Sequence, residues 1–417
     1  MRQALRILLF AAVAAAGVSC SAVRRCKAPE LALPERFAGL LPDDSLTIAD
    51  MAWWQFFGDS TLLSIIRRTL DNNREMLAAA ARVERMRALY RVEKANRLPD
   101  LKLNALADYE TNDYSGESAK RDAEFGLKAT LGWEADLWGN LRWAKRKGEA
   151  EYRATVEDER AMRMTLVAEA ASAYFRLMAL DNELAIVRRT LSTRREGVEQ
   201  ARLRFEGGLT SETVYQQAKV EYASTASLVP ELERRISVTE NGLALLMGDY
   251  SDREIPRGRL ETGDRLSDSL PVGIPSTLLQ RRPDVRASEL RLRSAMAAAG
   301  MAYADRFPRL NLTLTGGWEN DELKGFFRSP FSYVAAAVAS PLFGFGRKKA
   351  RYEAALAAYD EARLGYEQKV LEVFRETDDA LVTYRNARRT AEAKGYLCDA
   401  AFKYVALARA QYRAGSI

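Results

Sequence analysis

The chain has 417 residues, of which 47% are hydrophobic and 29% are charged, and its formal net charge is +6. Histidine is absent, and the three cysteines, Cys20, Cys26 and Cys398, are widely spaced. The chain therefore lacks the commonest metal ligand and general acid–base group, and it lacks the cysteines for a zinc site or a disulfide framework. This composition speaks against an enzyme and predicts no metal and no cofactor. Basic residues are interleaved with acidic ones, which speaks against nucleic acid as a partner.

The first residues are predicted to be an export signal. Arg2 and Arg6 precede an apolar run over residues 7–18, which is shorter than a membrane-spanning helix requires. A cysteine directly after such a run resembles a bacterial lipoprotein cleavage site. We therefore predict a signal peptide over residues 1–19, lipidation of Cys20 and an anchored leader over 20–59. The alternative is a plain secretory signal with an incidental cysteine.

Next in the chain come a helix and two strands. Apolar residues at spacings of three, four and seven predict one helix from Leu62 to about Asn96, where Pro99 ends it. Alternating apolar residues then predict strands over Leu101–Ala107 and Phe125–Trp133. The polar segment 110–121 makes the pair a hairpin with a long loop.

A long helical rod follows, from Leu141 to Phe205. It contains no proline, and apolar residues recur every seventh position, which is typical of a coiled-coil seam. These are Ala170, Leu177, Leu184, Leu191, Val198 and Phe205. Gly208 is expected to end the rod with a left-handed turn. A return helix over Thr210–Met247 should be kinked or divided at Pro230.

The same plan is predicted again further along. A helix over Pro283–Arg306 precedes strands over Leu310–Trp318 and Tyr333–Ser340, and a second proline-free rod covers Arg347–Arg413. Its heptad seam is Val370, Thr377, Tyr384, Ala391, Cys398, Val405 and Tyr412. Six of these seven lie 207 residues beyond a seam residue of the first rod. Cys398 corresponds to Leu191 and is predicted to be a small core residue.

These parallels indicate an internal duplication. We predict a first repeat over residues 60–248, a linker over 249–282 and a second repeat over 283–417. The sequence ends at Ile417, where the counterpart of the return helix would begin. Without that helix, four apolar residues in or beside the seam of the second rod should be more exposed than their counterparts 207 positions earlier. They are Leu381, Tyr384, Val405 and Tyr412, against Tyr174, Leu177, Val198 and Phe205.

The predicted fold class is mainly α with a β-barrel portion. Four strands cannot close a barrel, whereas bilayer strands must close completely because lipid offers no hydrogen-bond partners. Three chains would supply twelve strands and bring the rods together as a helical tunnel of about 100 Å. This architecture predicts a conduit across an outer membrane and into the periplasm.

Five segments carry a resemblance to known proteins: Leu137–Arg142, Asn241–Gly248, Ile274–Arg286, Trp53-Trp54 and Phe307-Pro308. They resemble the TolC-like outer-membrane factor family, in particular the lipoprotein branch that serves resistance–nodulation–division (RND) efflux pumps. The resemblance implies a passive homotrimeric efflux channel in outer-membrane lipid. Its partners would be an inner-membrane RND pump and a periplasmic adaptor that docks at the tunnel tips. The tip motifs match Arg204, Phe205, Gly208, Leu209, Tyr412, Arg413 and Gly415.

Two other functions stay open at this point: a protein-secretion outlet with the same fold, and a periplasmic coiled-coil lipoprotein that conducts nothing. The predicted hairpins favour a channel, because a spacer has no use for four alternating strands. The segment Arg281-Arg282-Pro283-Asp284 has two interpretations, an ordered linker between the repeats or a partner contact. Pro283 and Asp284 suit the first turn of a helix, which favours the linker.

Overall fold

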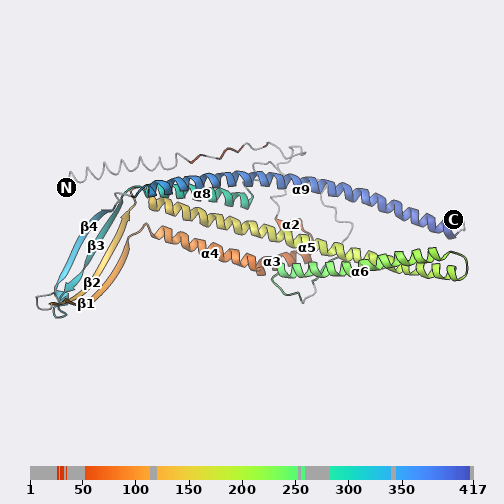
Figure 1. Cartoon of the computed structure of the whole chain (residues 1–417), viewed down its shortest axis with the longest axis horizontal. Helices are drawn as coiled ribbons and strands as arrows, with labels where there is room; N and C mark the ends of the chain where they lie inside the picture. The colour runs from red at the N-terminus through yellow and green to blue at the C-terminus, as the bar shows by residue number, and fades with distance from the viewer. Residues whose placement is uncertain are drawn as a thin grey trace.

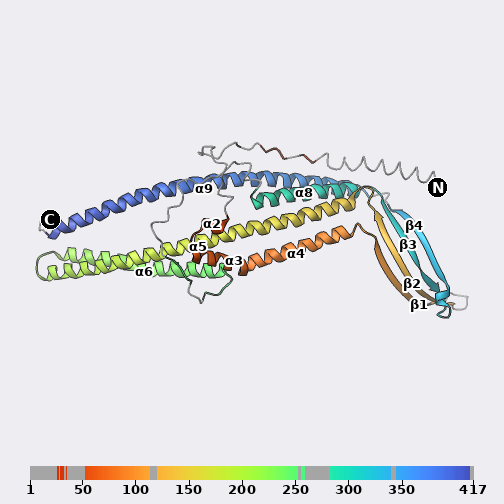
Figure 2. The same ribbon diagram turned by 180° about the vertical axis from the view of Figure 1, so that it is seen from behind.

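The computed structural model describes residues 26–27, 29–31, 34, 52–112, 120–251, 255–258, 281–339 and 344–413. It is an elongated molecule with a four-stranded sheet at one end and long helices running away from it (Figure 1). The turn between α5 and α6 and the last turn of α9 lie at the opposite end in both views (Figures 1 and 2).

The segment before the sheet contains the short helix α2 (Trp53–Phe56), α3 (Ser60–Asn72) and α4 (Arg74–Ala95). The prediction of one helix from Leu62 to Asn96 was therefore wrong at Asn73. Asn73 leaves the helical conformation, and its side chain accepts hydrogen bonds from the backbone N–H groups of Glu75 and Met76. Its Nδ2 also donates to the carbonyl of Leu246 at 3.0 Å. Asn73 thus caps α4 and attaches the break to the end of α6.

The first rod is confirmed as α5 (Asn140–Glu206), whose 67 residues correspond to about 100 Å. The return helix is α6 (Glu212–Leu246), which packs antiparallel along the distal part of α5. Pro230 lies inside α6, which is one continuous helix. Of the two predicted outcomes, division is therefore wrong, and a kink at Pro230 stays a prediction. The second rod is α9 (Arg347–Arg413), also 67 residues, and it is preceded by α8 (Pro283–Ala304). Both of these helices are confirmed.

The strands are β1 (Asp100–Asn112), β2 (Lys120–Ala135), β3 (Arg309–Asn320) and β4 (Pro330–Ala339). They form one antiparallel sheet in the order β1-β2-β3-β4. All four predicted strands exist, and each has more residues than predicted because the pairing continues toward the hairpin loops. A short 3₁₀ helix, Phe326–Arg328, lies between β3 and β4. Ser340 lies outside the described residues.

Two hydrophobic clusters hold the helices together. The larger one joins α3, α5 and α6 around Leu62, Ile66, Leu177 and Leu243, all completely buried. The smaller one joins α8 and α9 around Val285, Tyr359 and Val373, and Cys26 and Leu31 of the leader pack against it. The Tyr359 hydroxyl donates to the carbonyl of Lys27 at 2.6 Å, which fixes the leader to α9.

A group of hydrogen bonds around Tyr174 lies at the edge of the larger cluster, at mid-length of α5. The buried Tyr174 hydroxyl donates to Asp59 Oδ2 at 2.6 Å and accepts from the N–H of Gly258 at 3.0 Å. Asp59 in turn caps α3 through Thr61 and Leu62. Burial, with the hydrogen bond to Asp59, raises the pKa of Tyr174.

The seam of α9 is more exposed than the seam of α5, as predicted. Tyr174 and Leu177 are completely buried, whereas their counterparts Leu381 and Tyr384 are only partly buried. Val405 is 44% exposed, and its counterpart Val198 is partly buried. The fourth pair stays a prediction, because the side chain of Tyr412 is not described.

Cys398 is exposed, so its prediction as a core residue was wrong for the single chain. The reason is the uneven cover of α9. Helix α8 packs along its first third, where Tyr352, Tyr366 and Val373 are buried. Every described residue from Ala391 to Leu407 is exposed.

Candidate functional site at the helical tip

The turn between α5 and α6 is a Schellman motif. The N–H of Leu209 donates to the carbonyl of Arg204 at 2.8 Å, and the N–H of Gly208 donates to the carbonyl of Phe205 at 2.9 Å. Gly208 has φ +71°, a left-handed conformation that a residue with a Cβ adopts at a cost. A Cβ on Gly208 would meet no atom within 4 Å, so the requirement for glycine lies in the backbone conformation. The turn therefore has a defined shape and an open surface.

Exposed apolar side chains surround this turn. Leu209 is 74% exposed, and Leu203 and Val214 beside it are about half exposed. Phe205 stacks on Tyr215 of α6, with ring centroids 6.0 Å apart and an interplanar angle of 14°. Isolated exposed apolar residues are ordinary, but a group of them at the end of a rod is typical of a docking surface.

A row of three charged residues lies along one face of α5 just before the turn. Arg202 donates to Glu199 one turn back at 2.5 Å and to Glu206 one turn forward at 2.9 Å. Its hydrogen bond holds the pKa of Glu199 below the usual range. The three residues are exposed, so they stiffen the last turns locally and contribute little to global stability.

The structure brings together Arg204, Phe205, Gly208 and Leu209, the four predicted residues of the first tip. Arg204 is exposed, like Leu209. Tyr412 and Arg413 form the last described turn of α9, and only their backbone is described. Gly415 and Cys20 lie outside the described residues. The end of α9 is at the same end of the molecule as the α5–α6 turn (Figure 2).

The Arg281–Asp284 segment is a structural joint between the two helices of the second half. Arg282 grips Asp284 through two hydrogen bonds of 3.0 and 2.7 Å and reaches Glu376 of α9 at 2.8 Å. Lys369 of α9 lies 2.9 Å from the same Asp284 carboxylate. Burial works to raise the pKa of Asp284, but the hydrogen bonds from Arg282 and Lys369 outweigh it and hold the pKa well below the usual range. The contacts agree with the linker interpretation.

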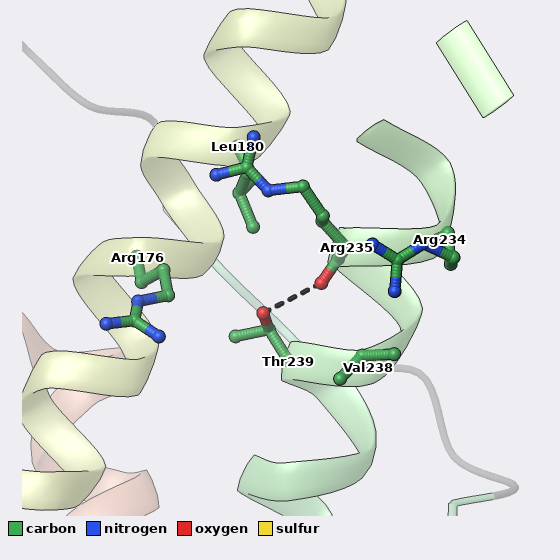
Figure 3. Close-up of a pocket in the computed structure, with 6 residues that line it drawn as sticks. All are labelled: Arg176, Leu180, Arg234, Arg235, Val238 and Thr239. Carbon is green, nitrogen blue, oxygen red and sulfur yellow. Dashed lines mark hydrogen bonds between the residues drawn. The ribbon is translucent and has the colours of Figure 1, made fainter. Parts of the chain in front are cut away.

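A cavity of about 370 Å³ lies between α5 and α6 (Figure 3). It is lined by Arg176, Leu180, Arg234, Arg235, Val238 and Thr239. Arg234 is committed to Glu231 through hydrogen bonds of 3.0 and 2.7 Å, and the Thr239 hydroxyl donates to the carbonyl of Arg235 at 2.8 Å. It is a groove along a helix pair, with no catalytic arrangement among the residues that line it.

Two absences apply to the described part of the chain. No group of three or more cysteine, aspartate or glutamate side chains there is arranged to hold a metal ion. None of the helices described has the length and apolarity needed to cross a bilayer.

The strand register extends the apolar alternation of the sequence to a contrast between the two faces of the whole sheet. Paired residues share a face, so the register sorts every strand residue. Among the described side chains, one face has no charged residue at all. It displays Leu101, Leu103, Ala105, Ala107, Tyr109, Phe125, Leu127, Leu131, Trp133, Leu310, Leu312, Leu314, Trp318, Val334 and Val338. The other face has nine charged residues. The alternation in the sequence predicted an apolar face for single strands, and the register shows that these faces coincide across the sheet.

The sequence matches the family model described as outer membrane efflux protein, over residues 65–249 and 274–417. It is 31% identical to outer membrane protein OprJ of Pseudomonas aeruginosa over 412 residues, which covers 95% of this chain and 84% of OprJ. It is 27% identical to the probable outer membrane lipoprotein SilC of Salmonella typhimurium, covering 93% of this chain and 85% of SilC.

Solved structures give the same result. A crystal structure of a membrane protein from Pseudomonas aeruginosa superimposes with a TM-score of 0.85 at 29% identity. The match covers 94% of this chain and 90% of that one. The likeness thus extends over the sheet and the long helices together.

Proposed function

Because this chain belongs to the outer membrane efflux protein family, we propose that three copies of it close a twelve-stranded barrel continued by an α-helical tunnel. The protein is a passive outer-membrane channel of a tripartite efflux pump, and it is not an enzyme. The proposal concerns the way in which the chain builds that channel, meets its partners and is anchored.

The contrast between the two faces of the sheet carries the proposal. A bilayer-spanning sheet must turn an uncharged face to lipid and can turn a charged face only to water. The uncharged face of this sheet contains leucine, valine and alanine at its centre and Trp133, Trp318 and Tyr109 toward its ends, as lipid-facing strands do.

The two edge strands of the sheet require pairing with further copies of the chain. β1 and β4 each pair on one side only, so each has a row of unpaired backbone groups that lipid cannot satisfy. Joining β4 of one copy to β1 of the next continues the antiparallel order. Three copies supply twelve strands and close the ring, since an open sheet would leave two edges in lipid.

The helices follow the strands. The contacts α4–α5, α5–α8 and α8–α9 place four helices side by side in the same order as β1 to β4. Repetition of this layer around the threefold axis would build a helical wall beneath the barrel. α5 and α9 would extend that wall by about 100 Å. The repeated order of helix, hairpin and 67-residue helix fits a duplicated unit of residues 60–248 and 283–417, joined by 249–282.

The tip would be the docking surface for a periplasmic adaptor. It combines a turn of defined shape, exposed apolar side chains around that turn and the exposed Arg204. This is the pattern of a small interface with a hydrophobic centre and a charged rim. The second tip would add Tyr412, Arg413 and Gly415. The inner-membrane pump would be the third member of the assembly.

The leader contact favours Cys20 over Cys26 as the lipid-anchored residue. Tyr359 is hydrogen-bonded to Lys27 and lies 12 residues after the start of α9. Lys27 is therefore fixed about 18 Å along α9 from the end of that helix nearest the sheet. Cys20 precedes Lys27 by seven positions, which span at most about 25 Å, enough to reach the membrane surface. Cys26 is the residue next to Lys27, so its Cα lies only about 4 Å from that of Lys27 and cannot reach the membrane surface.

The test is complementation in a strain that lacks its own outer-membrane factor and expresses the cognate pump and adaptor. We expect the wild-type chain to restore resistance to the exported compounds. Leu209→Asp with Phe205→Ala should lose resistance while the protein still reaches the outer membrane as a trimer. Val238→Asp is the control, because Val238 is an apolar residue of α6 away from the tip, and its exposure of 58% lies between those of Phe205 and Leu209. Full resistance in the tip variant would contradict docking at this surface.

A further inference from the structure

The charged face of the sheet contains information about permeation that the family likeness does not give. In the proposed barrel this face lines the pore, so the inference rests on the proposed function. We propose that the loop-side half of this face, with Lys128 as its single described cation, makes the barrel selective for cations over anions.

The described charges on this face are unequal in number. Six are carboxylates and three are cations, which leaves −3 per chain. They are Asp100, Asp108, Glu110, Glu124, Glu134 and Glu319, with Lys102, Lys128 and Arg309. Three copies would place nine excess negative charges around one pore.

The excess is confined to the half of the sheet farther from the helices. At the helix end the charges of the four strand residues Asp100, Lys102, Glu134 and Arg309 sum to zero. Lys102 lies 3.1 Å from Asp100, and Arg309 lies 3.8 Å from Glu134 and 2.9 Å from Asp305, which precedes β3. The loop-side half contains Asp108, Glu110, Glu124 and Glu319 against Lys128 alone. All of the net charge of −3 therefore sits toward the outer mouth.

The strand register concentrates like charges instead of separating them. Asp108 is directly opposite Glu124. Like charges directly across an antiparallel pair are destabilising. Their repulsion falls when mobile cations gather in front of them, and a water-filled pore supplies those cations. Rings of carboxylates are the usual means by which a pore favours cations.

Lys128 determines how much of this negative charge is neutralised within the chain. Its ammonium lies 2.8 Å from Glu319 and 3.7 Å from Glu124, and 5.9 Å from the centre of the Phe331 ring. It therefore partly neutralises two carboxylates. Without Lys128 both would face the pore uncompensated, so this one residue limits the cation preference.

Reversal potentials across planar bilayers under a potassium chloride gradient test the inference on the purified full-length protein. We expect the wild-type reversal potential to lie between zero and the potassium equilibrium potential. Lys128→Gln should move it further toward the potassium equilibrium potential. Asp108→Asn, and Glu124→Gln with Glu319→Gln, should move it toward zero.

Lys219→Gln is the matched control, because Lys219 also lies over an aromatic ring, that of Tyr215 on α6, far from the sheet. We expect no shift for it. Circular dichroism and trimer content show that each variant is folded. A conducting trimer with equal permeability to both ions, or variants without effect, would overturn the inference and leave the channel intact. A folded wild-type trimer that passes no current would contradict the channel, and the inference with it.

Discussion

The two 67-residue helices have corresponding apolar seams but different surroundings. α5 is covered by α3, α8 and α6 along most of its length, and its seam is buried from Ala170 to Leu184. α9 is covered by α8 near the sheet, and beyond Val373 its seam is partly or fully exposed. A heptad seam thus specifies a surface that requires a partner, and the partner decides whether the surface is buried within the chain. We expect the distal seam of α9 to be buried when copies assemble.

The largest expected effect concerns the covered helix. Leu184 is 8% exposed within the cluster of α3, α5 and α6. Leu184→Asp deletes a buried leucine and introduces a carboxylate there, so we expect a loss of at least about 3 kcal/mol in unfolding free energy. Ile186→Asp, 53% exposed on the same helix, should cost less than about 0.5 kcal/mol. Denaturant titration followed by circular dichroism compares them, and equal losses would contradict the covered seam.

A smaller effect is expected at the joint that attaches α8 to α9. Asp284→Asn removes the carboxylate between Arg282 and Lys369 and should cost about 2 kcal/mol. Because the folded pKa of Asp284 is depressed, its contribution is complete above the unfolded pKa of about 4. That contribution is lost as the pH falls through the folded pKa. Wild type and variant should therefore converge in stability toward pH 2, and a constant difference would refute this role.

The tip turn sharpens the comparison at the far end of α5. Gly208→Ala places a Cβ at φ +71° and should cost about 1 kcal/mol. Gly197→Ala, in the interior of the same helix with open space around it, should stabilise by about 0.5–1 kcal/mol. Thermal unfolding of the two variants gives the signs. A destabilised Gly197→Ala would mean that something packs against α5 there.

The smallest effect on folding is expected on the uncovered helix. Val405→Asp, on an exposed site, should change the unfolding free energy by less than about 0.5 kcal/mol. The same change at its partly buried counterpart Val198 should cost more. We expect Val405→Asp nevertheless to abolish the trimer in detergent sizing, because the seam would be buried on assembly. A normal trimer would show that this surface stays exposed.

The sequence predicted the long helices well and their surroundings less well. Heptad spacing and the absence of proline located α5 and α9 to within a residue of their ends. The break at Asn73 was missed because the apolar spacing continues across it. Two interactions stabilise the break: the cap that Asn73 forms on α4, and its hydrogen bond to Leu246 far along the chain. Cys398 was misplaced because periodicity does not tell whether a partner lies in the same chain. At the tip, glycine and apolar residues predicted the turn, whereas the stacking of Phe205 on Tyr215 required the structure.

Disulfide trapping at the sheet edges tests the central claim, closure of three sheets into one barrel, most directly. Cys26→Ala and Cys398→Ser provide a background without these two thiols, in which Leu103→Cys on β1 is combined in turn with Val334→Cys, Ala336→Cys or Val338→Cys on β4. Our account predicts that at least one pair yields, on oxidation in membranes, a covalent trimer and nothing larger. The single variants should yield monomer. A ladder beyond three, or covalent dimers without trimer, would contradict a closed barrel of twelve strands.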